Sequence, residues 1–186
     1  MNRFISTDMP LDGLKLIERQ RIGDHRGYLA RLFCADELSQ VSWDKPIAQI
    51  NHTYTALQGT VRGLHFQKAP HTEMKLVSCI RGEVWDVAVD LRPDSPSFLN
   101  WHAEILSAIN CKAFLIPEGF AHGFQCMSDD VELLYCHSAS YAQEFEDALN
   151  ALDPYLSIDW PNPITEISAK DATHPFIDSK FKGVQL

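Results

Sequence analysis

The sequence lacks the features that mark several broad classes of protein. No apolar run is long enough to cross a bilayer, which takes roughly 20 apolar residues in a helix. No internal repeat or low-complexity segment occurs, which excludes repeat and fibrous architectures. The first residues, Met1-Asn2-Arg3-Phe4, carry no apolar h-region, so we expect no secretory signal and a cytoplasmic protein.

Cysteine and positive charge are also scarce. The five cysteines are an odd number and form no C-x-x-C pair, so we expect reduced thiols that serve as small core residues. The 16 Lys and Arg against 25 Asp and Glu give a formal net charge of −9. The surface as a whole therefore favours neither nucleic acid nor an anionic membrane, although a local basic pocket for a phosphate stays open.

What the sequence does contain is one short strand pattern after another. The 186 residues are enough for a single domain with a sizeable core. Apolar and polar residues alternate, and turn residues recur about every 8–12 positions, which indicates a β-sandwich or barrel. Strands are predicted at 14–22, 28–33, 47–54, 75–80, 83–91, 101–106, 112–116, 121–127 and 131–138, with tight turns at 24–27 and 81–82.

The remaining segments have weaker patterns. Residues 35–38 are predicted to form a short helical turn, and residues 141–150 a loop or a short helix. The segment 153–186 is rich in Pro and resembles a loop. Because it carries Trp160 and Phe176, we expect parts of it to pack on the barrel.

Four polar side chains stand where the interior of a barrel normally has Val, Ile or Leu: His65, Lys75, His122 and Tyr135. Their neighbours in the sequence are apolar. This pattern predicts a small barrel whose inside holds a ligand instead of only a packed core.

His65 lies in a predicted strand. If Leu64 and Phe66 face one side of that strand, His65 faces the other. Arg62 falls on the Leu64 side by simple alternation, but a bulge near Gly63 would turn it inward. A neutral His is the natural proton acceptor near pH 7, and the alternative is a His that is simply satisfied within the core.

Lys75 and the tyrosines Tyr135 and Tyr141 each allow two interpretations. Lys75 is either a cation aimed at a phosphate or a developing oxyanion, or a residue at the strand end with its ammonium group in water. A phenol can act as a general acid, although both tyrosines also fit ordinary aromatic positions in the core or at the rim.

Asp86 and Asp90 alternate with valines and so project to one face of their strand. If that face is buried, each carboxylate needs a partner, and His122 is a suitable one because a carboxylate fixes the tautomer of its neighbour. If the face is outside, both carboxylates are solvated.

Residues 117–122 resemble the second sequence motif of cupins, Pro-x-Gly-x-x-His, whose His binds metal in metal-dependent members. The first cupin motif requires His-x-His. Here His65 is followed by Phe66 and Gln67, so the ligand cluster is missing and we expect no metal.

Taken together, these residues resemble the dTDP-4-dehydrorhamnose 3,5-epimerase family across nearly the whole chain. The resemblance implies an all-β, cupin-like jelly-roll β-barrel with short peripheral helices, formed by a single domain of residues 1–186. It also implies a homodimer without metal or redox cofactor. The matching residues are Asp24-x-Arg26-Gly27, Gln49-x-Asn51, Arg62 to Gln67, Lys75-Leu76-Val77, Gly82 to Arg92, Ser95-Pro96, Pro117-x-Gly119 to Phe124, Tyr135, Tyr141, Asp153-Pro154, Ile158-x-Trp160-Pro161 and Ser168-x-Lys170-Asp171.

The family's substrate is a nucleotide-linked 4-keto-6-deoxy sugar, whose ketone acidifies the hydrogens at C3 and C5. The resemblance implies His65 as the base, oriented by Asp171, and Tyr135 as the acid on the opposite face of the ring. Lys75 would stabilise the enolate.

The resemblance also implies the residues that bind this substrate. His122 and Asp86 would line and polarise the pocket, and Tyr141 and Glu146 match positions on the nucleotide side. The diphosphate and sugar would be held by Arg26, Arg62, Gln49 and Asn51. Since an N-terminal strand lends residues to the partner's site in this family, we expect Arg26 to act across a dimer interface.

Three positions depart from the family pattern. Arg31 replaces a Glu, Cys136 replaces a Lys after the acidic Tyr, and Asn150-Ala151 replaces an Arg-Trp pair. Arg31 and Asn150-Ala151 stand at positions on the nucleotide side. We therefore expect retained chemistry with altered recognition: another sugar, inversion at only one of C3 and C5, or another nucleotide.

Three other functions are also to be weighed against these residues. A 3,4-ketoisomerase would use the same scaffold, but Tyr135 favours an epimerase. A metal-dependent cupin lacks its ligands here. A nucleotide-sugar-binding module without activity would need neither an acid nor a base.

Overall fold

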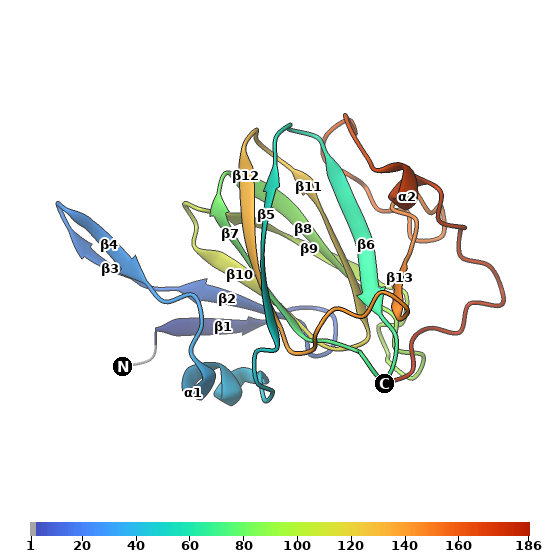
Figure 1. The fold of residues 1–186 in the computed structure, drawn as a ribbon, viewed down its shortest axis with the longest axis horizontal. Coiled ribbons are helices and arrows are strands. Elements are labelled where there is room, and N and C mark those ends of the chain that lie inside the picture. Colours follow the sequence, from blue (N-terminus) through green and yellow to red (C-terminus); the bar gives the residue numbers. More distant parts are fainter. Residues whose placement is uncertain (1–2) are drawn as a thin grey trace.

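The computed structural model describes residues 3–186, and its regular secondary structure is mainly antiparallel β-sheet (Figure 1). Met1 and Asn2, which begin the segment expected to lack a secretory signal, lie outside the described residues. Among residues 3–186, no helix has the length and apolarity that crossing a membrane requires.

Two sheets face each other and enclose the core, in the arrangement of a jelly roll. The first sheet has the order β1 (Phe4–Asp8), β2 (Lys15–Arg19), β10 (Lys112–Ile116), β7 (Lys75–Arg81), β12 (Val131–His137) and β5 (Gln49–Thr55). The second has the order β13 (Glu146–Ala148), β6 (Val61–Gln67), β11 (Phe120–Cys126), β8 (Glu83–Asp90) and β9 (Trp101–Ser107).

Alternation along the strands separates an inner core from two outer ones. Val77, Phe114 and Phe124 point between the sheets and are nearly inaccessible to solvent. Their neighbours in sequence, such as Leu76 and Leu115, pack on the outside of the first sheet. Each fully buried side chain of this size stabilises the fold by about 1.5–3 kcal/mol.

Peripheral segments cover the outer faces of both sheets. The helix α1 (Ala35–Leu38) and the 3₁₀ turn η1 (Ser39–Val41) lie at the first sheet, where Leu38 is buried in the outer cluster. The C-terminal segment covers the second sheet, and Trp160 meets Trp85 edge to face at 5.4 Å between ring centroids. This segment includes the helix α2 (Ala169–Ala172).

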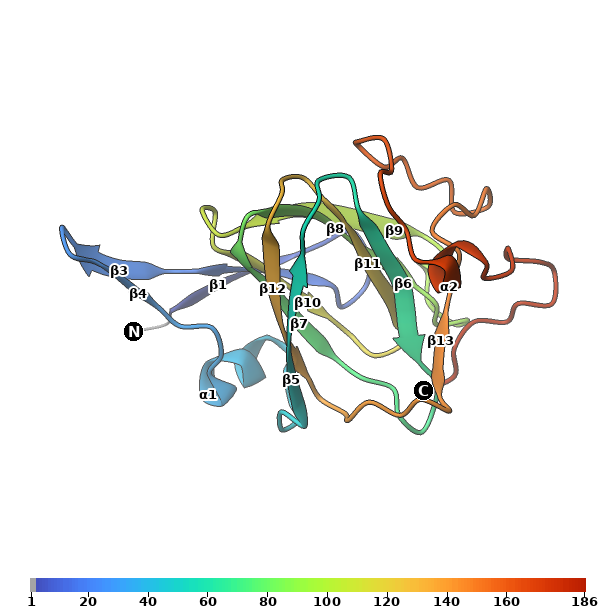
Figure 2. The same ribbon diagram turned by 45° about the horizontal axis from the view of Figure 1, so that its top comes forward.

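A two-stranded hairpin, β3 (Arg21–Asp24) and β4 (Gly27–Ala30), extends away from the barrel in both Figure 1 and Figure 2. We call residues 21–30 the arm. Apolar side chains of the arm, Tyr28 and Leu29, are 58% and 69% exposed. The arm thus presents apolar surface that the rest of its own chain leaves uncovered.

The predicted all-β fold is confirmed, with corrections at particular segments. The predicted strand 14–22 is two strands, because the chain leaves the first sheet after Arg19 and enters the arm. Residues 141–150, expected to be a loop or helix, contain the short strand β13. Parts of the segment 153–186 pack on the barrel as expected, Trp160 among them, whereas Phe176 is 55% exposed.

The cysteines are free, as expected. Cys79, Cys111, Cys126 and Cys136 are buried, and Cys34 is partly buried. Burial raises the pKa of the Cys126 thiol to about 11, so this group stays a neutral thiol that packs as a small apolar residue.

Candidate active site

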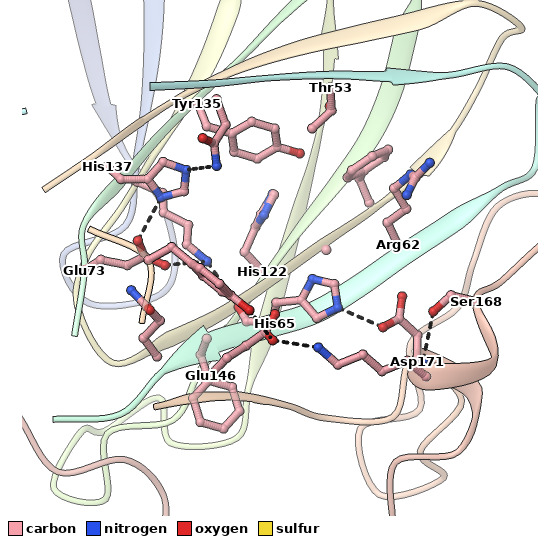
Figure 3. A pocket seen from close by; sticks show the side chains of 18 residues that line it. Thr53, Arg62, His65, Glu73, His122, Tyr135, His137, Glu146, Ser168 and Asp171 are labelled. Atoms are coloured by element: carbon pink, nitrogen blue, oxygen red, sulfur yellow. Dashed lines mark hydrogen bonds and ion pairs between the residues drawn. The ribbon is translucent and has the colours of Figure 1, made fainter. Parts of the chain in front are cut away.

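Polar side chains replace the apolar core at one end of the barrel and line a cavity of about 400 Å³ (Figure 3). Two walls face each other across it. Strands β6 and β11 form the wall that carries His65 and His122, here called the His65 wall. Strands β5, β7 and β12 form the wall that carries Lys75 and Tyr135, here called the Lys75 wall.

A bulge in β6 brings two functional groups to the same face. His65 pairs with His122 on β11, but Arg62, three residues earlier, pairs with Phe124, only two residues later. The extra residue reverses the alternation, so both Arg62 and His65 line the cavity. Gly63 permits the bulge: its φ is +121°, and a Cβ there would lie 2.5 Å from the Cα atom of a glycine on β11.

His65 forms a hydrogen bond with Asp171, at 2.8 Å between Nε2 and Oδ1. Asp171 lies in α2, where the Ser168 hydroxyl accepts the hydrogen bond of its backbone N–H. Burial acts to raise the pKa of Asp171, but the bond to His65 and its charge outweigh burial and hold that pKa below its ordinary value. An ionised carboxylate only accepts, so Nε2 carries the hydrogen and Nδ1 of His65 is free to take a proton.

His122 forms a second pair with a carboxylate. Its Nε2 lies 2.9 and 3.0 Å from the two oxygens of Asp86, and both residues are buried. The solvated alternative for Asp86 and Asp90 is therefore excluded. Asp90 is bound by Arg92, Ser95 and Ser97 instead, outside the cavity lining.

Tyr135 projects from the Lys75 wall and is 8% exposed. Burial, and to a lesser extent the charge of Asp86, raises the pKa of Tyr135 far above its ordinary value. The phenol therefore keeps its proton at neutral pH. It meets the ring of His122 edge to face, with ring centroids 5.8 Å apart.

Lys75 is also buried, which excludes the alternative with its ammonium group in water. Its Nζ lies 3.3 Å from the backbone oxygen of His65 and 3.3 Å from Oε1 of Glu73. The buried ammonium group of Lys75 thus lines the same cavity as the imidazole of His65 on one wall and the phenol of Tyr135 on the other.

Several residues expected to bind the substrate lie around the cavity mouth. Asn51, Tyr141 and Glu146 line it, whereas Gln49 lies behind Asn51 and donates a hydrogen bond to its Oδ1 at 2.9 Å. The hydroxyl of Tyr141 donates to Glu146 at 3.0 Å. Glu146 also forms an ion pair with Lys170 at 2.6 Å.

Other expected residues do not reach the cavity of their own chain. Arg26 lies at the tip of the arm, where its side chain is 79% exposed and pairs with Asp24 at 2.7 Å. Arg31 follows the arm and pairs with Glu37. If these arginines contact a substrate, that substrate is bound by another subunit.

The departures from the family pattern lie mostly in the core. Asn150 is buried and donates to the backbone oxygens of Ala172 and His174 at 3.2 and 2.7 Å, and its neighbour Ala151 is buried too. The cavity lining includes neither of them, contrary to the expectation of a position on the nucleotide side. Cys136 lies in the outer cluster of the first sheet, on the opposite face of β12 from Tyr135.

Sequence reasoning missed Glu73 and His137, which both line the cavity. The signal was present for His137, which follows Tyr135 by two residues in β12, because residues two apart in a strand share a face. Glu73 precedes β7, which begins at Lys75, so this rule does not place it. Thr53, Ser168 and Lys170 were also missed as lining residues. Within residues 3–186, no group of three or more His, Cys, Asp or Glu is arranged to hold a metal ion.

Comparisons with known proteins agree with this geometry. A family model described as dTDP-4-dehydrorhamnose 3,5-epimerase matches residues 8–179. A protein of that name from Sinorhizobium fredii is 39% identical over 163 residues, which are 87% of this chain and 84% of that protein.

A solved structure of the enzyme named RmlC from Legionella pneumophila, in complex with dTDP-4-keto-L-rhamnose, superposes with a TM-score of 0.91. It is 37% identical, and the match covers 98% of this chain and 99% of that one. A dTDP-4-dehydrorhamnose 3-epimerase from Streptomyces niveus is 34% identical over 162 residues, 87% of this chain and 78% of that protein. Proteins named for inversion at one carbon and at two thus both resemble this chain.

Proposed function

The chain belongs to the dTDP-4-dehydrorhamnose 3,5-epimerase family, a family of isomerases, and from this premise we propose a reaction for its cavity. We infer that it epimerises C3, C5 or both of a dTDP-linked 4-keto-6-deoxyhexose, in the synthesis of rhamnose or a similar deoxysugar. The observation that carries the proposal is a carboxylate-bound imidazole, His65, facing a buried phenol, Tyr135, across one cavity.

In the proposed mechanism, Nδ1 of His65 removes the proton from a carbon next to the ketone. The electron pair of the C–H bond moves onto the ketone oxygen and gives an enolate, which the Lys75 ammonium group stabilises. Tyr135 then donates a proton to the same carbon from the opposite face and inverts the centre. Asp171 keeps the imidazole in the required tautomer, and the Asp86–His122 pair lines the sugar subsite.

The binding roles follow from charge and position. Arg62 presents a guanidinium group to the cavity, which suits a diphosphate, and Asn51 offers amide contacts to the sugar. Tyr141 and Glu146 stand at the mouth, where the nucleoside would lie. The ligand named for the Legionella structure, dTDP-4-keto-L-rhamnose, supports this class of substrate.

We further propose a cytoplasmic homodimer of single-domain chains, in which the arm of one chain reaches the cavity of the other. The exposed apolar side chains Ile22, Tyr28 and Leu29 of the arm support a covered position in an assembly. In such a dimer, Arg26 would supply a cation to the partner's diphosphate subsite, and Gln49 would complete it from the same chain as His65.

The reaction is tested by deuterium incorporation from solvent into dTDP-4-keto-6-deoxyglucose, followed by NMR at C3 and C5. We expect exchange at one or both carbons with the wild type and its loss with His65→Ala. His52→Ala is the matched control, because His52 also pairs with a carboxylate, Glu132, but is exposed on the outside of the barrel. Absence of exchange with the wild type would refute the proposed substrate.

Inversion at a single carbon is the second candidate, favoured by the similarity to the 3-epimerase from Streptomyces niveus. The same experiment separates the two. Exchange at both C3 and C5 identifies a 3,5-epimerase, whereas exchange confined to C3 identifies a 3-epimerase.

A further inference from the structure

A chain of hydrogen bonds runs along the Lys75 wall, from the mouth of the cavity inward. The backbone N–H of Tyr141 donates to Oε1 of Gln49 at 2.9 Å. Nε2 of Gln49 donates to Oδ1 of Asn51 at 2.9 Å. Nδ2 of Asn51 lies 3.4 Å from Nε2 of His137, and Nδ1 of His137 lies 2.8 Å from Oε2 of Glu73 (Figure 3).

The first member of this chain fixes the direction of all the others. A backbone N–H can only donate, so the atom of Gln49 that it meets is the amide oxygen, and the amide nitrogen of Gln49 points to Asn51. Asn51 therefore accepts with its oxygen and presents its nitrogen to His137. Nε2 of His137 must then be the acceptor, and the hydrogen sits on Nδ1, where it is donated to Glu73.

This chain of hydrogen bonds ends at Glu73, which also contacts the buried ammonium group of Lys75. One carboxylate oxygen accepts from His137, and the other lies 3.3 Å from Nζ of Lys75. Burial acts to raise the pKa of Glu73, but the hydrogen bond from His137 and the charge of Lys75 outweigh it and lower that pKa. Glu73 is therefore a carboxylate at neutral pH and holds both side chains at once.

His137 also contacts the phenol directly. It lies two residues after Tyr135 on β12, and the two rings stack with centroids 5.8 Å apart and planes inclined by 16°. In the sheet, His137 pairs with Lys75 on β7. The imidazole thus lies between the two groups that the proposed mechanism uses on this wall.

We propose that Glu73 and His137 are positioning residues for the reaction: Glu73 fixes the ammonium group of Lys75, and His137, held as the Nδ1–H tautomer, fixes Glu73 through the hydrogen bond that it donates. This inference rests on the proposed function. Since Gln49 and Asn51 belong to the same chain of hydrogen bonds, it also connects the mouth of the cavity at Tyr141 with the ammonium group inside.

The first test measures kcat and KM of Glu73→Gln, which keeps the size of the side chain and removes its charge. We expect kcat to fall on the order of 10-fold to 100-fold with little change in KM, since a displaced cation costs catalysis more than binding. The matched control is Glu132→Gln. Glu132 also joins a His and a cation, with His52 at 2.9 Å and Arg81 at 3.3 Å, but lies outside the cavity, so this variant should match the wild type.

The second test compares two replacements of His137. The amide nitrogen of Asn can take the place of Nδ1 and donate to Glu73, whereas Leu cannot. We expect His137→Asn to retain most of kcat and His137→Leu to lose about tenfold or more. Equal kcat values for the two variants would overturn the role of His137, and this pair decides the question even if Glu73→Gln does not fold.

The third test does not depend on activity. Long-range ¹H–¹⁵N NMR of protein labelled at histidine should show His137 as the Nδ1–H tautomer, and this signal should change in Asn51→Leu. An Nε2–H tautomer would overturn the inference. The two proposals can fail separately: a wild type without deuterium exchange refutes the reaction, whereas an active wild type with an unaffected Glu73→Gln refutes the positioning roles.

Discussion

The cavity and the arm use the same chemistry in opposite surroundings. In the cavity, Asp171 is buried and bound by His65 at 2.8 Å. In the arm, Asp24 is bound by Arg26 at 2.7 Å, and both side chains are largely exposed. Each carboxylate has a pKa below its ordinary value. In Asp171, burial acts to raise the pKa, but the interactions with His65 outweigh it. In Asp24, the hydrogen bonds from Arg26 lower the pKa.

This contrast shows that the surroundings of such a pair determine what it can do. As the buried residue of α2, Asp171 imposes one tautomer on an imidazole that faces a substrate-sized space. At the tip of the arm, water and salt screen the charges, so the pair contributes little to stability. The arm gains a function only if another surface covers it, and four predictions test this difference.

The largest effect on the reaction is expected from replacing Tyr135 in the cavity, compared with Tyr28 in the arm. Tyr135→Phe removes the proposed acid but leaves His65, so we expect deuterium exchange to continue while net inversion falls on the order of 10²-fold to 10⁴-fold. The measurement is NMR of exchange and product in the same sample. Tyr28→Phe is the control in the arm, where the ring lies 4.2 Å from the Arg21 guanidinium group, and it should change neither rate.

Undiminished inversion by Tyr135→Phe would assign the acid to another group on the Lys75 wall. The candidate on that wall is His137, whose ring is stacked on that of Tyr135. The double variant Tyr135→Phe/His137→Leu would then lose inversion.

The next largest effect concerns the tip of the arm. We expect Arg26→Ala to lower kcat/KM about 10-fold to 100-fold, since a charge-assisted hydrogen bond to a phosphate is lost. Mixing this variant with His65→Ala should restore activity, because a mixed dimer has one site with both lesions and one intact site. If subunits exchange freely, recovery should approach about a quarter of the wild-type rate.

Two other results of the mixing experiment would contradict this prediction. No recovery in a sample shown to contain mixed dimers would mean that Arg26 serves its own chain. Full activity of Arg26→Ala alone would mean that the tip of the arm contacts no substrate.

The sequence predicted the fold of the buried barrel better than that of the exposed arm. Alternation placed most of the barrel strands to within a few residues, because each of those strands has one face in the core. The strand β1 (Phe4–Asp8), at the edge of the first sheet, was not predicted. The break between β2 and β3 was missed because all four residues of β3 are exposed and no burial pattern marks the change. The strand β13 was too short, at three residues, for alternation to show.

The cavity was predictable where local rules apply. Gly63 suggested the bulge that turns Arg62 inward, and a period of two places His137 beside Tyr135. Neither rule reveals that Glu73 joins Lys75 to His137, because that contact depends on the register between β7 and β12. The proposed role of Arg26 involves a second chain, which no pattern within one chain specifies.

A smaller effect concerns stability in acid. Because the pKa of Asp171 is lower in the folded protein, its ionised form stabilises the fold fully above the unfolded pKa, near 3.9, and this stabilisation is lost as the pH falls through the folded value. In Asp171→Asn, which cannot ionise at this position, we expect the unfolding free energy to fall less as the pH drops below about 4 than in the wild type. Urea denaturation at several pH values measures this, and Asp24→Asn in the arm should change the curve less, because solvent screens the exposed Asp24–Arg26 pair.

The smallest effect is expected at Arg31, just beyond the arm. Arg31 pairs with Glu37, and its side chain is 42% exposed, so Arg31→Glu exchanges one exposed interaction for a like-charge contact. Such changes alter the free energy of unfolding by about 0.5 kcal/mol or less. If Arg31 is remote from every substrate, the preference for dTDP over other nucleoside diphosphates, measured by calorimetry, should shift less than about threefold. A larger shift would place Arg31 beside a nucleotide in the partner subunit, and the arm would then act in recognition along its length instead of only at its tip.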